Sequence, residues 1–102
     1  MIKLRALAHG RTGDKGNTSN ISVVARDPAD YPRLVAHLTA ERVKAHFGPL
    51  VEGPVVRHAL PQLGALNFVL EGALGGGVTR SLALDAHGKC LSSLLLDLDI
   101  PD

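Results

Sequence analysis

Two stretches with strand-like patterns flank a polar, glycine-rich segment near the start of the chain, and this arrangement limits the available folds. In residues 2–9, IKLRALAH, apolar and polar side chains largely alternate. A period of two predicts a half-buried β-strand. Residues 20–26, NISVVAR, are rich in β-branched side chains, which favour strands. The two strands are therefore predicted to pair as an antiparallel hairpin around a long polar loop.

The next part of the chain changes to helical periodicity. Residues 27–48, DPADYPRLVAHLTAERVKAHFG, carry two sets of apolar residues at helical spacing that do not join smoothly. This pattern predicts a short helix that begins near Pro32 and a second from Thr39 to Phe47, or one kinked helix. Thr39 is a suitable N-cap, and Gly48 lies where a helix C-terminus favours a left-handed residue.

Strand and helix signals alternate in the rest of the chain. Residues 55–60, VVRHAL, predict a third strand, and residues 61–72 carry leucines at helical spacing and predict a helix. Residues 78–100 predict two strands around a turn. We expect a single small α+β domain over residues 1–102, with an antiparallel sheet of about five strands and two or three helices on one face.

Composition excludes several classes of protein. Of 102 residues, 45% are hydrophobic and 21% charged, which is typical of a globular domain. The formal charge is only +1 and three residues are aromatic, so the sequence disfavours nucleic-acid binding. The single cysteine, Cys90, forms no internal disulfide. Because no leader or membrane-spanning pattern stands out, we expect a cytoplasmic protein without membrane contact.

A first candidate site lies in the polar segment between the first two predicted strands. Its glycines leave backbone amides accessible, its two cations can attract an anion, and its amide and hydroxyl groups can orient that anion. The order Lys15-Gly16-Asn17 excludes a Walker A loop. The competing interpretation is a solvated hairpin turn. The residues of this candidate site are Arg11, Thr12, Gly13, Asp14, Lys15, Gly16, Asn17 and Thr18.

A second candidate site surrounds three consecutive glycines after the predicted helix over residues 61–72. A ligand there would meet backbone amides, whereas close packing in a plain helix-to-strand connection explains the glycines equally well. Asn67 interrupts an apolar pattern and is a candidate buried hydrogen-bonding group. The residues of this second set are Asn67, Gly75, Gly76, Gly77, Thr79 and Arg80.

The sequence carries no complete catalytic or metal-binding set. The five histidines and one cysteine lack the spacing of a metal site, and no cofactor fingerprint is present. His9 opens into the first polar segment and Asp14 lies within it, so these two residues are the candidates for a general base. We therefore assign no cofactor and no metal, and leave the catalytic residues unknown.

Four long segments resemble the C-terminal domain of the acyclic terpene utilisation (AtuA) family. They are GRTGDKGNTSNISVVAR, YPRLVAHLTAERVKAHFG, LPQLGALNFVLEGALGGGVTRSLALDAHGKCLSS and LLLDLDI. They cover nearly the whole chain in order and include both candidate sites. The resemblance implies a ferredoxin-like fold and a free-standing version of a domain that typically follows a much larger N-terminal domain. It also implies a link to the catabolism of acyclic terpenes and branched acyl-CoA compounds.

Two functional hypotheses follow. In the first, which we favour, the chain is an accessory or ligand-binding subunit whose polar loops bind a carboxylate, phosphate or CoA-type anion. Its sheet edge then joins a homo-oligomer or a large AtuA-type subunit. In the alternative, it is a small enzyme that hydrates or isomerises an acyl-CoA or carboxylic acid, with Asp14 or His9 as the base and Arg11 and Lys15 as anion holders.

Overall fold

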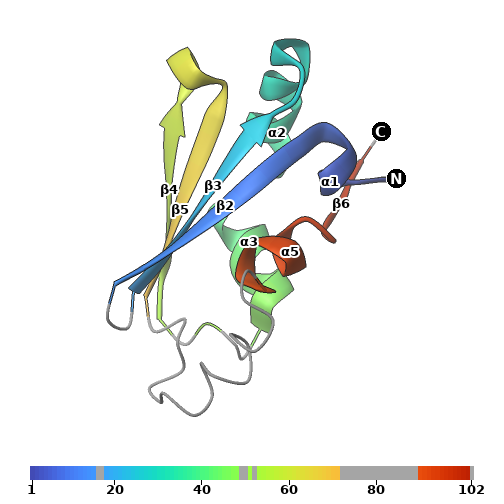
Figure 1. Cartoon of the computed structure of the whole chain (residues 1–102). Coiled ribbons are helices and arrows are strands. Elements are labelled where there is room, and N and C mark those ends of the chain that lie inside the picture. Colours follow the sequence, from blue (N-terminus) through green and yellow to red (C-terminus); the bar gives the residue numbers. More distant parts are fainter. Residues whose placement is uncertain (16–17, 49–50, 52, 72–89, 102) are drawn as a thin grey trace.

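The structure, a computed structural model, describes residues 1–15, 18–48, 51, 53–71 and 90–101 (Figure 1). The helices, strands and contacts of the fold are those of these residues. The elements in chain order are β1 (Ile2–Lys3), α1 (Leu4–Leu7), β2 (Ala8–Lys15), β3 (Thr18–Ala25), η1 (Pro28–Asp30), α2 (Tyr31–His37), α3 (Ala40–Phe47), β4 (Val55–Leu60), η3 (Pro61–Leu63), β5 (Ala65–Glu71), α5 (Cys90–Leu95) and β6 (Asp99–Ile100).

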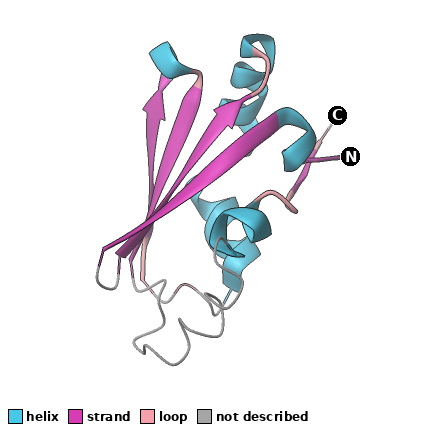
Figure 2. Ribbon diagram, in the orientation of Figure 1, coloured by secondary structure: helices cyan, strands magenta, loops and turns pink. Residues whose placement is uncertain are grey.

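Four strands form the main sheet in the order β2-β3-β5-β4, and every neighbouring pair is antiparallel. A two-stranded ladder of β1 and β6 brings the two ends of the chain together. Helices α2, α3 and α5 lie on one side of the main sheet (Figure 2). Each hairpin is followed by helix, and this ββαββα order is a cyclic permutation of the ferredoxin-like βαββαβ arrangement. The expected α+β, ferredoxin-like fold is therefore confirmed.

The hydrophobic core lies between the sheet and these helices. On β3, Ile21 and Val23 are fully buried, and on β5 the alternate residues Leu66, Phe68 and Leu70 are fully buried. Residues at alternate positions share one face of a strand. The helices, with the residue that follows α2, supply the other half of the core with Leu34, Leu38, Val43, Phe47 and Leu95.

Local signals located the middle helices correctly. The Thr39 hydroxyl accepts a hydrogen bond from the backbone N–H of Arg42 at 3.1 Å, which confirms Thr39 as the N-cap of α3. Gly48 follows the last residue of α3 with a φ of 59°, a left-handed value that glycine adopts without strain. Strand β4 has the predicted bounds, Val55–Leu60.

The predicted strand over residues 2–9 is wrong in its middle, where α1 forms a single turn. Leu4 and Leu7 are three residues apart and both buried, a spacing that a helical turn provides and a strand does not. The turn lets the chain leave the ladder with β6 and enter the main sheet as β2.

The predicted helix over residues 61–72 is also wrong. A single 3₁₀ turn, η3, is followed by Gly64 with a φ of 61° and then by β5. Leucines 66 and 70 fit a helical spacing of four, but Phe68 is buried between them and gives a period of two. Pairing of β5 with both neighbouring strands decides the outcome, because tertiary context overrides local preference.

Two further expectations need correction near the polar segment and at the C-terminus. Ladder pairing of β2 with β3 confirms the antiparallel hairpin, but it continues to Lys15 opposite Thr18, so most of the predicted loop is strand. Residues 90–95 form α5 in place of the predicted last strand, which is restricted to β6. The other predicted strand and the turn that follows it lie outside the described residues.

Candidate functional site

The sheet face opposite the helices carries a row of four polar side chains, one from each strand. The register places Arg11 of β2 opposite Ser22 of β3, Ser22 opposite Asn67 of β5, and Asn67 opposite His58 of β4. Directly paired residues of antiparallel strands project to the same face. We call this line of four residues the central row, and the face that carries it the open face.

Hydrogen bonds between neighbouring strands order the open face. Asn67 Nδ2 donates to Ser22 Oγ at 2.9 Å across the two central strands. At the end of the same strands, the Thr18 hydroxyl donates to Glu71 Oε1 at 3.1 Å. The described buried side chains leave no nitrogen or oxygen without a hydrogen-bond partner. The hydrogen bond between Asn67 and Ser22 therefore orders the middle of the open face.

The open face divides into two chemically different halves on either side of its centre. The polar half, on β2 and β3, carries the residues His9, Arg11, Gly13, Thr18, Asn20 and Ser22 together with the apolar Val24. The half on β4, β5 and the turn between them, which we call the apolar half, carries the apolar residues Val56, Leu60, Leu63 and Val69 on either side of His58 and Asn67, with Glu71 at its end. Within the described part of the chain, no helix covers either half (Figure 2).

Arg11 differs from most other cations of the chain. Arg57 Nη1, for example, donates to the carbonyl oxygens of Val35 at 2.8 Å and Leu38 at 3.0 Å. Such bonds hold the C-terminal end of α2 and the residue after it, whereas the exposed Arg11 side chain lies on the open face. Seven side chains bind other parts of the fold in this way, namely Lys3, Arg5, Arg26, Arg33, Arg42, Lys44 and Arg57.

Thr12, the neighbour of Arg11, belongs to the opposite face. Its hydroxyl oxygen accepts a hydrogen bond from the backbone N–H of Ser92 at 3.1 Å. Ser92 lies in the first turn of α5, where backbone N–H groups lack partners within the helix. Thr12 therefore holds α5 on the sheet. Because it faces the helices, Thr12 does not form a binding site together with Arg11, which lies on the open face.

The two candidate bases occupy positions on different faces of β2. His9 is exposed on the open face, opposite Val24. Asp14 holds the register position opposite Ser19, whose side chain is fully buried on the helix side. Since strand positions alternate between faces, these two positions do not converge on one site.

For some predicted site residues the structure gives the position in the strand register, and others lie outside the described residues. Lys15 ends β2 at the register position opposite Thr18, and Gly13 pairs with Asn20. A Cβ atom at Gly13 would lie 3.2 Å from Asn20 Nδ2, so glycine leaves room for the Asn20 side chain. The predicted site residues outside the described residues are Gly16, Asn17, Gly75, Gly76, Gly77, Thr79 and Arg80.

Sequence reasoning missed three polar residues and the whole apolar half of the open face. The polar ones are Asn20, Ser22 and His58. In NISVVAR the signal was present as alternation, because Asn20 and Ser22 occupy every second position, whereas in VVRHAL the polar residues Arg57 and His58 are adjacent and give no such signal. Pairing these two segments with the strand that contains Asn67 would have aligned the central row.

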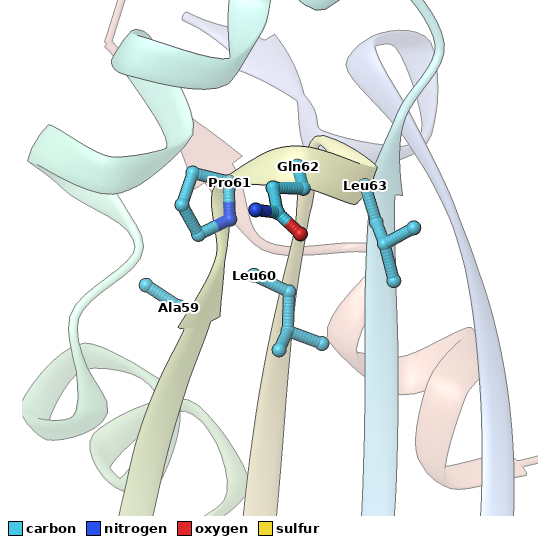
Figure 3. A pocket seen from close by; sticks show the side chains of 5 residues that line it. All are labelled: Ala59, Leu60, Pro61, Gln62 and Leu63. Atoms are coloured by element: carbon cyan, nitrogen blue, oxygen red, sulfur yellow. The ribbon is translucent and has the colours of Figure 1, made fainter.

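The described hollows do not lie on the central row. One surrounds the turn between β4 and β5 and is lined by Ala59, Leu60, Pro61, Gln62 and Leu63 (Figure 3). A second, on the other side of this turn, includes Tyr31, whose hydroxyl donates to the Ala65 carbonyl at 3.1 Å. The described residues contain no group of three or more His, Cys, Asp or Glu placed to hold a metal ion. No described helix is long and apolar enough to cross a membrane.

Comparison with known proteins agrees with this architecture. A family model described as AtuA ferredoxin-like domain matches residues 2–101. The match confirms the resemblance derived from the sequence segments. Neither a curated protein nor a solved structure matches the chain.

Proposed function

Because the chain belongs to the AtuA ferredoxin-like domain family, we propose that it is an accessory domain that docks through its open face on a larger AtuA-type protein. The observation that carries this proposal is the open face itself, a four-stranded surface with exposed polar and apolar side chains and no described helix over it. The implied link to acyclic terpene and branched acyl-CoA catabolism, and a cytoplasmic location, are parts of the same proposal.

The dimensions and shape of the open face suit a protein better than a small molecule. Neighbouring strands lie about 4.8 Å apart, so four strands present a surface roughly 15 Å from first to last axis. Side chains add to this width, and stable protein interfaces bury about 800 Å² on each partner. Small-molecule sites are concave, whereas the described hollows lie away from the central row.

A pair of tryptophan variants tests docking through this face. Asn20 is exposed on the open face and Glu41 is exposed on α3. We expect Asn20→Trp to weaken binding to a large AtuA-type protein at least about tenfold, because the bulky ring separates the two surfaces. Glu41→Trp should bind as the unmodified chain does. Biolayer interferometry, with melting curves of both variants, measures this, and equal affinities for the two variants would reject the open face as the docking surface.

Arg11 favours a second candidate function, the binding of a small carboxylate, phosphate or CoA-type anion. Its guanidinium is exposed on the open face, next in register to the Ser22 hydroxyl. Guanidinium groups bind such anions through paired hydrogen bonds. A thermal-shift series with acetate, phosphate and CoA should then raise the melting temperature of the unmodified chain but not of Arg11→Gln. A ligand at a hundred times its Kd stabilises by about 2.7 kcal/mol. Equal shifts in both proteins would exclude Arg11 as the anchor.

The small-enzyme alternative receives less support. A general base must lie within hydrogen-bond reach of the proton that it removes. His9 and Asp14 occupy positions on different faces of β2, and the open face lacks enclosure around the central row. A homo-oligomer stays a prediction from the sequence.

A further inference from the structure

The unequal halves of the open face define the chemistry of the surface that would cover it. This inference rests on the proposed docking function and specifies the partner side of that contact. Four large hydrophobic side chains are exposed in the described residues, and three of them belong to the apolar half: Val56 at 44%, Leu60 at 38% and Leu63 at 69%. Concentration of exposed apolar side chains in one region is a mark of an interaction surface.

These three side chains follow the edge strand and its turn and form the apolar strip, which His58 interrupts at the central row. Val56 and Leu60 lie on the outward side of β4 with the exposed His58 between them, and Val69 lies directly opposite Val56 on β5. Leu63 extends the strip beyond the end of the strand, and the Leu60 and Leu63 side chains lie on the same side of the hairpin (Figure 3). An apolar ridge of a partner could lie along this strip and remove it from water.

The polar half calls for negative charge. Arg11 is exposed there, His9 lies on the same strand, and His58 lies at the other end of the central row. Glu71 lies at the far end of β5, where it is already hydrogen-bonded to Thr18. Carboxylates opposite Arg11 would therefore match the charge of this half.

A second copy of the chain matches this face poorly. A two-fold axis along the central row, perpendicular to the strands, would join the two apolar halves but would also set Arg11 against the Arg11 of the second copy. An axis parallel to the strands would set Arg11 against the His58 position and each apolar half against a polar half. Buried like charges and mismatched halves both cost free energy, so an isologous face-to-face dimer lacks complementarity.

We propose that the docking partner presents an apolar ridge with carboxylates on one side of it. The ridge lies along β4 and the β4–β5 turn, and the carboxylates lie over β2. This arrangement fixes the orientation of the chain on its partner, since a rotation by half a turn about the normal to the sheet would place carboxylates on the apolar strip. The charged side of the contact should affect mainly the association rate, and the apolar side should affect mainly the dissociation rate.

Association kinetics with a large AtuA-type protein, measured from about 50 to 300 mM NaCl, test the proposal through Arg11→Gln and Leu63→Ser. Arg11→Gln should slow association several-fold at low salt and flatten its salt dependence, because charge steers encounter over about a Debye length. Leu63→Ser should speed dissociation about tenfold and leave the salt dependence intact, because apolar contacts act after docking. Leu63→Met, which keeps the apolar surface, and Lys3→Gln, which removes a cation on β1, are the matched controls.

The outcomes separate this inference from the proposed function. The inference is supported if Arg11→Gln slows association and flattens its salt dependence, if Leu63→Ser mainly speeds dissociation, and if both controls behave as the unmodified chain does. A complex that Asn20→Trp weakens but whose salt dependence Arg11→Gln does not alter overturns the carboxylate assignment while docking stands. If the unmodified chain forms no complex at all, both proposals fail. Analytical ultracentrifugation of the chain alone completes the test, since a dimer that Leu63→Ser dissociates would assign the apolar strip to a second copy and overturn the inference.

Discussion

Along β3, side chains alternate between two environments that differ in almost every physical respect. Ile21 and Val23 are fully buried under the helices, whereas Asn20 and Ser22 face away from them. The inner face is held by burial of apolar area, which is non-directional and large in free energy. The open face is arranged by register and short hydrogen bonds, which fix side chains without much stabilisation. Adjacent residues of one strand can therefore have separate roles, one in stability and the next in binding.

The largest contrast between the two faces should appear at neighbouring positions of β5. Phe68 is fully buried, so Phe68→Ala should lower the free energy of unfolding by about 3–5 kcal/mol through lost apolar contact and a residual cavity. Asn67 donates a hydrogen bond to Ser22 on the open face, so Asn67→Ala should cost about 1 kcal/mol. Urea denaturation measures both. If Phe68→Ala is too unstable to fold, Phe68→Leu gives a smaller loss at the same site, and a larger loss for Asn67→Ala than for Phe68→Leu would contradict the contrast.

A second, smaller contrast lies on β4. Arg57 pairs with Phe68 in the register and donates to two carbonyl oxygens at the end of α2, so Arg57→Met should destabilise the chain by about 2 kcal/mol. His58→Met, at the next position on the open face, should stay within about 0.5 kcal/mol of the unmodified chain. Differential scanning calorimetry gives the comparison. Equal melting temperatures for the two variants would mean that the Arg57 hydrogen bonds contribute little to stability.

Sequence reasoning succeeded where the signal is local. The Thr39 cap, the left-handed Gly48 and the apolar run of β4 each depend on residues close in the chain, and each was predicted correctly. It failed at β2, where glycine and aspartate favour turns but pairing with β3 extends the ladder to Lys15. It also failed at β5, because leucines four apart satisfy a helix and a strand equally.

The candidate site was less accessible to prediction than the fold. The central row depends on the contact between Ser22 and Asn67, which lie 45 residues apart, and no local pattern encodes that pairing. The sequence did draw attention to Arg11 and Asn67, which the structure places in one row. It grouped Thr12 with Arg11, because adjacency in the sequence does not reveal that strand neighbours face opposite ways.

The smallest contrast, between Thr12 and Arg11, separates stability from binding most directly. Thr12→Val removes the oxygen that accepts the Ser92 N–H while keeping the shape of the side chain, so it should cost about 1 kcal/mol, in the range of a lost helix cap. Arg11→Gln should change the free energy of unfolding by less than about 0.5 kcal/mol, because its side chain is exposed.

Urea denaturation of the two variants gives these free energies, and amide hydrogen exchange at Ser92 shows whether the cap itself has been lost. Thr12→Ser, which restores the accepting oxygen, should recover the stability and the protection of that amide. Full protection of the Ser92 amide in Thr12→Val would show that another group replaces the hydroxyl and that the helix-side role of Thr12 is wrong. If Thr12→Val lowers stability while Arg11→Gln lowers only the affinity for a partner or an anion, two consecutive residues of β2 divide folding and recognition between the faces of one strand.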